Sequence, residues 1–339
     1  MEEIFGAHRE SKEVRMKQTV LIIDGDLTAY QAAAVVEKRT VNVIHKRSQR
    51  SKVFKTRTEF KKFLKDTGKE YKEGVYELVD IQEAAPLSHA CKIVKNMIVS
   101  LTNKLKATMT EVWIGDNPSN FRNFLELPEK YKGNRDDMLR PLLLKETKQY
   151  LTDNNQGGVI RDIEADDQII IRWFELKEEG HKPIVLSRDK DSKGCVGITL
   201  CNPDNEEVIE IPAFGYIRYN DEKKKIEAIG LHNYCYQLLH GDPSDNYTPS
   251  DLHKKKFGDK SILKLLEPCN NVDELFQAVE DKYKEWFPEP LTYTTWDGKE
   301  VTKDYKQILE LYHQCVYMKR RKNDPTTFYS LWEEFKNDN

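Results

Sequence analysis

The strongest constraint on the fold is a pattern of four apolar runs that each end in an aspartate and are separated by segments of helical periodicity. Continuous apolar runs of this length are typical of strands buried on both faces of a parallel sheet. The four runs are TVLIID (19–24), EVWIGD (111–116), GGVIRD (157–162) and KPIVLSRD (182–189). The helical segments are 29–37, 86–105, 139–151 and 166–178. This alternation predicts an α/β fold with a central, mostly parallel sheet flanked by helices.

The acids at the ends of the four predicted strands share an expected position. They are Asp24, Asp116, Asp162 and Asp189. In open α/β sheets, ligands bind beyond the carboxyl ends of the strands. We therefore expect the four carboxylates to converge at one edge of the sheet.

Further acids lie in the short motifs EADD, SRDKD and GDPSDN. Each motif alone has an ordinary explanation, because acids favour the first turn of a helix and Asp, Pro and Asn form turns. Together, however, they provide oxygen ligands without accompanying His or Cys, which favours two Mg²⁺ or Mn²⁺ ions over zinc. Two such ions, about 4 Å apart, can promote phosphodiester hydrolysis. The candidate ligands are Asp24, Asp116, Glu164, Asp166, Asp167, Asp189, Asp191, Asp242 and Asp245.

The charge of the chain is small overall but unevenly distributed. The formal net charge is −3, yet eleven lysines and arginines lie between Lys38 and Lys65 against one acid, Glu59. A basic surface combined with an acidic metal pocket fits a polyanionic partner, although such a run is also typical of a solvated charged face. The run belongs to segment 38–80, whose sequence predicts a β-hairpin with a basic turn and then a short basic helix beginning at Thr58.

The remaining sequence indicates a protein of a reducing compartment. The six cysteines form no CxxC pair, the N-terminal segment is polar, and no apolar run reaches membrane-spanning length. These features predict free thiols, a cytoplasmic location and no membrane partner. Short β segments are expected at 195–229, and helices are expected from Gly230 to the end of the chain.

The motifs IIDGD, GDNPSNFR, YKGNR, EADD, SRDKD and GDPSDN resemble, in type and order, those of the 5′-nuclease superfamily. This family includes flap endonucleases, the 5′-nuclease domains of bacterial DNA polymerases and short phage exonucleases, and the chain is most similar to the phage type. The resemblance covers about residues 19–266. It implies a PIN-like fold with a helical arch, a helix–hairpin–helix region and a helical C-terminal part. It also implies a two-metal-ion phosphodiesterase that cuts DNA near a free 5′ end or at a 5′ flap.

The resemblance also implies roles for individual residues. Asp24, Asp116, Glu164 and Asp166 would hold one metal ion, whereas Asp189, Asp191, Asp242 and Asp245 would hold the other. Asp189 is also a candidate ligand shared by both ions. Asp167 would act through bound water or help to hold the site. In YKGNR, Lys132 would polarise the scissile phosphate and Arg135 would hold it, because a planar guanidinium suits two phosphate oxygens.

Nucleic-acid-binding residues are implied in two further segments. Arg122 and Tyr131 lie in the motifs of the expected arch. Tyr131, Phe121 and Phe124 are candidates there either for stacking on unpaired bases or for loop packing. The sequence KKFGDKSILKLL (255–266) resembles the family's helix–hairpin–helix, although Phe257 and a lone glycine replace its Gly-x-Gly turn. Its candidate contacts to the duplex backbone are Lys254, Lys255, Lys256, Gly258 and Lys260.

The expected organisation is a flexible tail (1–18), a catalytic domain (19–245) and a helix–hairpin–helix and helical region (246–339). The catalytic domain would include the 38–80 insertion, which we hypothesise widens the DNA-binding surface, and the arch (117–140). The implied partners are DNA with a 5′ end or flap, an RNA–DNA hybrid and replication proteins, in DNA replication, repair or degradation. Two alternative functions stay open, namely a PIN-type RNase with a smaller acidic site and a catalytically silent protein that binds DNA junctions.

Overall fold

The computed structural model describes residues 17–116, 119–136, 138–255 and 257–336. The expected flexible tail at 1–18 therefore lies outside the described residues, except for its last two positions. The candidate DNA-binding residue Lys256 also lies outside them.

The centre of the molecule is a six-stranded sheet in the order β6-β5-β1-β7-β8-β9. All neighbouring strands are parallel except β8 and β9. The strands are β1 (Thr19–Asp24), β5 (Met109–Gly115), β6 (Gln156–Ile160), β7 (Lys182–Leu186), β8 (Thr199–Cys201) and β9 (Val208–Glu210). The predicted α/β fold with a mostly parallel sheet is thus confirmed, and all four predicted strands form part of it.

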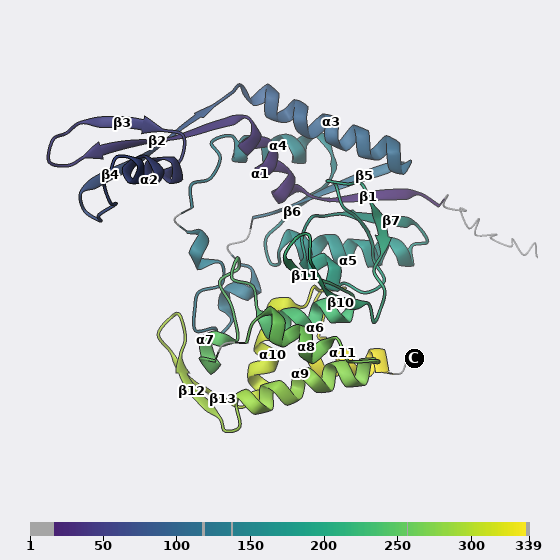
Figure 1. Ribbon diagram of the computed structural model, residues 1–339. Coiled ribbons are helices and arrows are strands. Elements are labelled where there is room, and N and C mark those ends of the chain that lie inside the picture. The colour runs from purple at the N-terminus through teal and green to yellow at the C-terminus, as the bar shows by residue number, and fades with distance from the viewer. Residues whose placement is uncertain (1–16, 117–118, 137, 256, 337–339) are drawn as a thin grey trace, which may run out of the picture.

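Helices cover both faces of this sheet (Figure 1). Along β1, Leu21 and Ile23 pack under the helices of one face, whereas Val20 and Ile22 pack on the other. All four side chains are fully buried, which explains why the strand is continuously apolar. The first face carries α1 (Gly25–Val35), α3 (Leu87–Leu105) and α4 (Leu144–Asn154), and the second carries α5 (Ala165–Glu178).

The insertion after α1 forms a separate antiparallel sheet in the order β3-β2-β4, covered on one face by helix α2. Its elements are β2 (Glu37–His45), β3 (Ser51–Phe54), α2 (Arg57–Asp66) and β4 (Tyr76–Ala84). The predicted hairpin is present. The basic helix begins at Arg57 rather than at Thr58, because the Thr56 hydroxyl accepts a hydrogen bond from the backbone N–H of Glu59 (3.0 Å) and caps the helix.

The C-terminal part packs around a second large core, which includes Phe276, Tyr283, Tyr312 and Phe328. Its elements are β10 (Tyr216–Asn220), β11 (Lys225–Ile229), α6 (Leu231–His240), α7 (Ser250–His253), α8 (Asp259–Leu266), α9 (Val272–Trp286), β12 (Leu291–Thr294), β13 (Glu300–Lys303), α10 (Tyr305–Val316) and α11 (Phe328–Lys336). The expectation of helices alone after Gly230 is wrong. The hairpin β12–β13 turns at Asp297 and Gly298, and the positive φ of Gly298 (86°) suits such a turn.

The segment expected to form a helical arch has a different conformation. Its described residues form two short 3₁₀ helices, η1 (Phe121–Phe124) and η2 (Gly133–Arg135), and no α-helix. Lys132 has a left-handed backbone (φ 55°), which is incompatible with a continuous α-helix through YKGNR. Among the described helices, none is long and apolar enough to cross a membrane.

Gly25, in the sequence Asp24-Gly25-Asp26, allows the start of α1 to lie directly against β5. A Cβ atom at this position would lie 2.6 Å from Ile114 Cγ1 and 2.9 Å from the carbonyl oxygen of Trp113. We therefore predict that Gly25→Ala lowers the free energy of unfolding by about 1–3 kcal/mol, through overpacking, in urea denaturation. The control is Gly158→Ala, because a Cβ there would meet its nearest atom at an ordinary 3.6 Å. Equal losses in both variants would contradict the explanation.

Candidate metal centre

The acids that follow β1 and β7 are held by tight turns at the carboxyl edge of the sheet. Asp24 ends β1 and caps α1, since its Oδ1 accepts hydrogen bonds from the backbone N–H groups of Asp26 (2.9 Å) and Leu27 (3.2 Å). Beyond β7, the Oδ1 atom of Asp189 accepts a hydrogen bond from the backbone N–H of Asp191 (2.9 Å). These turns fix both carboxylates as the chain leaves the sheet.

Asp191, Asp242 and Asp245 form the group best arranged to hold a metal ion among the described residues. One carboxylate oxygen from each lies within 4.8 Å of the others. Asp191 begins the 3₁₀ helix η3 (Asp191–Gly194), whereas the other two lie in the loop after α6. Gly241 starts this loop with a positive φ (74°), and a Cβ there would lie 2.5 Å from Thr248 Cα. The close packing of the loop therefore requires glycine at this position.

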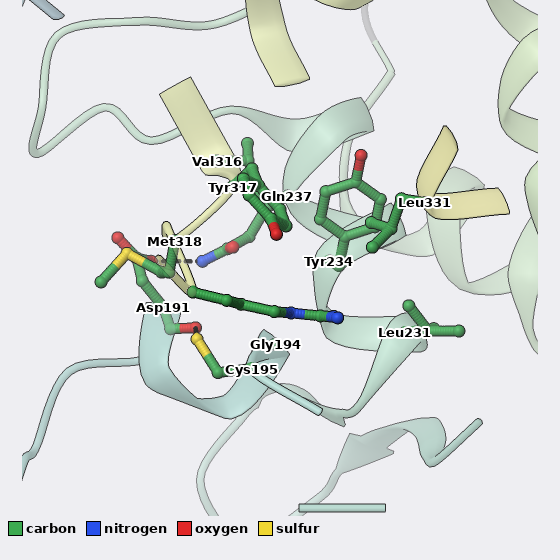
Figure 2. A pocket seen from close by; sticks show the side chains of 11 residues that line it. Asp191, Gly194, Cys195, Leu231, Tyr234, Gln237, Val316, Tyr317, Met318 and Leu331 are labelled. Carbon is green, nitrogen blue, oxygen red and sulfur yellow. Dashed lines mark hydrogen bonds between the residues drawn. The ribbon is translucent and has the colours of Figure 1, made fainter. Parts of the chain in front are cut away.

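The side chain of Gln237, on α6, orients one carboxylate of this group, that of Asp191. Its Nε2 donates a hydrogen bond to Asp191 Oδ1 (Figure 2). The sequence analysis missed this residue. The available signal was its place five positions before Asp242, on the helix that leads into the motif GDPSDN.

Asp166, in the first turn of α5, provides an unsatisfied ligand. Its Oδ1 atom is buried and has no hydrogen-bond partner. Burial raises the pKa of Asp166 well above its usual range, and the negative charges of Asp24 and Asp189 raise it further. A buried acceptor without a partner is rare in proteins, and an oxygen-binding divalent cation would satisfy it. The residues present therefore fit a Mg²⁺ or Mn²⁺ ion.

The carboxylates of the site divide into two electrostatic classes. Burial raises the pKa of Asp24 to about 7, and burial also raises the pKa values of Asp189 and Asp191. Asp242 behaves differently, since hydrogen bonds from Ser244 and Lys190 outweigh its burial and lower its pKa. Asp24, Asp189 and Asp191 therefore have too little positive charge around them in the protein to offset their burial.

Three basic side chains contact the other acids. Lys132 pairs with Glu164 and lies 3.5 Å from Asp245, whereas Arg135 pairs with Asp245. Lys190 lies 3.0 Å from Asp242. Although burial alone would lower the pKa of Lys132, the carboxylates of Glu164 and Asp245 raise it above its usual value. Lys132 is therefore a protonated donor at neutral pH, and the structure brings both residues predicted to act on the scissile phosphate to the acidic cluster.

Asp167 faces away from solvent and is held entirely by protein donors. Both of its oxygens accept hydrogen bonds from the Arg122 guanidinium, and Oδ1 also accepts one from the backbone N–H of Lys319 (3.0 Å). This arrangement fits the second of its two predicted roles, a carboxylate that helps to hold the site.

The structure corrects the expected nucleic-acid contacts of Arg122 and Tyr131. Arg122 is 1% exposed, because its guanidinium binds Asp167 and Glu164 and donates to the carbonyl oxygens of Cys315 and Tyr317. Tyr131 is 3% exposed, and its hydroxyl contacts Glu164 (3.0 Å) and Asp245 (2.9 Å). Neither side chain has a surface on which DNA could bind. Both position the carboxylates instead.

The expected convergence of the four strand-end acids holds only in part. The charge of Asp189 contributes to the raised pKa of Asp24, so these two acids share the site. Asp116 and Asp162 are both exposed, and Asp116 lies 3.7 Å from Arg161. Strand β5 therefore ends at the rim of the site.

Of the three candidate stacking residues, Tyr131 is buried, and the other two differ from each other. Phe124 is 71% exposed and is available to a ligand. Phe121 packs under two cations, since Arg122 lies 4.7 Å and Lys319 4.1 Å from its ring centre. The packing alternative thus fits Phe121, whereas stacking by Phe124 stays a prediction.

The expected helix–hairpin–helix consists of the four-residue helix α7, a turn and helix α8. Lys254, Lys255, Gly258 and Lys260 are exposed on it, as contacts to a duplex would require. Phe257, at the position where the resemblance predicts a glycine, packs edge-on against Trp286, with ring centres 5.2 Å apart. Packing against α9 therefore explains this departure from the family pattern.

We predict that the metal-free protein becomes less stable as the pH rises through about 7. The folded-state pKa of Asp24 is raised, so the stability that its proton provides is complete below the unfolded pKa and is lost as the pH rises through the folded one. The Tm without metal should be lower at pH 8 than at pH 6, and Mg²⁺ should raise it more at pH 8. Asp24→Asn, which keeps the helix cap, should weaken both effects, whereas the exposed Asp162→Asn should not. An unchanged pH dependence in Asp24→Asn would contradict this assignment.

We also predict that Arg122→Met lowers the free energy of unfolding by about 3–5 kcal/mol, because it leaves Asp167 buried without its counter-ion. Combining it with Asp167→Leu should cost less than the sum of the single changes. Arg218→Met, which removes an exposed pair with Glu227, should cost no more than about 1 kcal/mol. Urea denaturation measures all four variants, and strictly additive losses would show that the buried pair is not coupled.

Comparisons with known proteins find similarity at the level of three-dimensional structure. No protein-family model and no curated protein sequence matches the chain. Three similar solved structures come from phage T5. They are the D15 protein with metal ions (15% identity, TM-score 0.49, 95% of this chain and 98% of that chain), the 5′-exonuclease with zinc (15%, 0.48, 95% and 98%) and the D15 flap endonuclease with DNA and metal ions (14%, 0.49, 94% and 98%).

Proposed function

We propose that the protein is a divalent-metal-dependent 5′-nuclease that hydrolyses phosphodiester bonds near the 5′ ends of DNA, as an exonuclease and flap endonuclease of the phage type. The observation that carries this proposal is the oxygen-only cluster of Asp191, Asp242 and Asp245, beside Asp166 with its unpartnered oxygen. Carboxylates without His or Cys suit Mg²⁺ or Mn²⁺. The basic groups at the same site suit a phosphate-bearing substrate.

Two sets of carboxylates would hold two ions. Asp24, Asp166 and Asp189 influence one another electrostatically and form the first set, with Glu164 beside them. Asp191, Asp242 and Asp245 form the second set. These two sets would hold divalent ions, which would supply a more acidic bound water and charge stabilisation for the leaving oxygen of a phosphodiester. Asp116, at the rim, is the predicted ligand that the structure supports least.

Lys132 and Arg135 are the residues that would bind the scissile phosphate. Lys132 donates to Glu164 and Arg135 donates to Asp245. A bound substrate could therefore replace these carboxylates with its phosphate oxygens. The raised pKa of Lys132 keeps it cationic, which suits charge stabilisation and excludes a role as general base at neutral pH. Hydrogen bonds from Arg135 and Asn134 to the 243–245 loop hold this segment against the site.

The duplex would be held away from the cleavage point by the exposed lysines of α7, the following turn and α8. Lys254, Lys255 and Lys260 can contact phosphates, and Gly258 lets a backbone approach closely. Phe124 would stack on an unpaired base. Roles in DNA replication, repair or degradation, an RNA–DNA hybrid substrate, replication partners and a cytoplasmic location belong to the same proposal.

Cleavage assays test this function directly. The protein is incubated with Mg²⁺ and a 5′-labelled flap, a nicked duplex or a matched RNA strand, with EDTA as the control. We predict metal-dependent cleavage near the 5′ end of DNA. Asp189→Asn should reduce the rate of DNA cleavage by about 100-fold or more while DNA binding is retained, because it removes a proposed metal ligand. Asp162→Asn, an exposed strand-end acid of the same type, should cut at the normal rate.

The same assay distinguishes the two alternatives. Cleavage of RNA alone would favour a PIN-type RNase, whereas binding without cleavage on every substrate would favour a silent junction-binding protein.

Lys132→Met should slow cleavage of DNA with little loss of binding, since it removes a charge that acts on the scissile phosphate. Normal cleavage by Asp189→Asn would overturn the metal assignment.

A further inference from the structure

The insertion formed by β2, β3, α2 and β4 is an independent unit, which we call the basic arm (37–84). It folds around its own small core of Val41, Val43, Phe54, Phe60 and Leu64. In Figure 1 it projects from the end of the molecule near α1 and α3, beyond the central sheet. None of the proposed metal ligands or phosphate-binding residues lies in the basic arm, so the arm is not part of the metal centre.

The arm carries a dense set of positive charges that the protein itself does not neutralise. Ten exposed lysines and arginines between residues 46 and 72 form no ion pair within the described part of the chain. They are Lys46, Arg47, Arg50, Lys52, Lys55, Lys61, Lys62, Lys65, Lys69 and Lys72. Only three acids lie in the same stretch, namely Glu59, Asp66 and Glu70. Like charges this close repel one another, so folding alone does not favour the arrangement.

These charges lie on the α2 side of the arm and at its β2–β3 turn. They lie on the β2–β3 turn, on α2 and its following loop, and on the face of β3 that carries Lys52. The strand pairing places Asn42, Ile44, Val53 and Val79 on the opposite face of the sheet. On that face Lys38 is paired with Glu83 (3.9 Å). The segregation argues against a uniformly solvated surface and indicates a single polyanion-binding side.

Aromatic rings support some of the lysines on this side. Lys52 Nζ lies 4.2 Å from the centre of the Phe63 ring, and Lys61 Nζ lies 5.6 Å from that of Tyr71. These cation–π contacts orient the ammonium groups without neutralising their charge. The lysines thus stay available to anionic groups outside the protein.

The base of the arm is joined to the segment that carries the phosphate-binding residues. Gln82 donates a hydrogen bond to the carbonyl oxygen of Arg140 (2.8 Å), and Glu37 accepts one from the backbone N–H of Leu142 (2.6 Å). These positions follow Lys132 and Arg135 closely in the chain. The base of the arm is therefore anchored to the segment that follows Lys132 and Arg135 in the chain.

We propose that the α2 side of the basic arm binds the phosphate backbone of the substrate duplex, outside the cleavage site. This inference rests on the proposed function for the identity of the ligand. The composition favours DNA over an acidic protein, because eight of the ten unpaired residues are lysines and protein interfaces are depleted of lysine. Contacts to phosphates require only such unpaired cations.

The test is the salt dependence of duplex binding, measured by fluorescence anisotropy in EDTA so that no cleavage occurs. The variant is Lys61→Gln/Lys62→Gln/Lys65→Gln on α2. The control of equal charge is Lys223→Gln/Lys224→Gln/Lys225→Gln, on the turn after β10 and the first residue of β11. The probes are duplexes of about 30 and about 10 base pairs, roughly 100 and 34 Å long. Circular dichroism verifies that each variant is folded.

The α2 variant should bind the long duplex more weakly than the wild type. Between about 50 and 200 mM salt, the negative slope of log K against log salt should become less steep by about 0.9 for each phosphate that the variant can no longer neutralise. Binding of the short duplex and the cleavage rate at saturating substrate should be unchanged, since the metal centre is intact. The control should keep the slope of the wild type.

An unchanged slope in the folded α2 variant would overturn the proposal and would point to an acidic protein as the partner of the arm. If the wild type cuts DNA but the slope does not change, only the arm proposal fails. If the wild type binds the duplex through the arm but cuts no substrate, the proposed function fails and the arm proposal stands. Absence of any duplex binding by the wild type would overturn both.

Discussion

The buried guanidinium of Arg122 is the group on which the arrangement of the site depends. It binds Asp167 and Glu164 at the start of α5, and it donates to the carbonyl oxygens of Cys315 and Tyr317 at the end of α10. A buried charge is tolerated only when its donors are satisfied, so all these segments must be in place together. The end of α10 and the residues that follow it are therefore a structural component of the acidic site, even though they supply none of the candidate metal ligands.

Positive charge is distributed unequally among the carboxylates of the site. Lys132, Arg135 and Lys190 contact Glu164, Asp245 and Asp242. Asp24, Asp166, Asp189 and Asp191 have raised pKa values, because burial removes them from water and neighbouring carboxylates repel them. Such repulsion is costly in a metal-free protein, and divalent cations would relieve it. The basic arm shows the opposite imbalance, with cations that lack acids. Both surfaces are complementary to charged groups that the chain does not contain.

Much of the fold was predictable because its signals are local. The apolar run before Asp24 marks a doubly buried strand, and the alternation of such runs with helices indicates a parallel sheet. The hairpin β12–β13 was missed, although Asp297-Gly298 is a turn signal, because short strands beside long helices have weak periodicity. The arch was expected from a resemblance, but Lys132 has a left-handed backbone and the described residues around it form only 3₁₀ turns. Local sequence did not reveal that conformation.

The sequence by itself determined the class of the fold and the chemical character of the site, because apolar periodicity and the type of ligand atom depend on residues close together in the chain. Only the tertiary structure decided which charged and aromatic residues face a ligand. Arg122 and Tyr131 both lie in motifs that suggest DNA contact, yet both are buried under the acids that they position. Their burial depends on partners up to 195 positions away, and such distant packing leaves no periodic signal around the residues themselves.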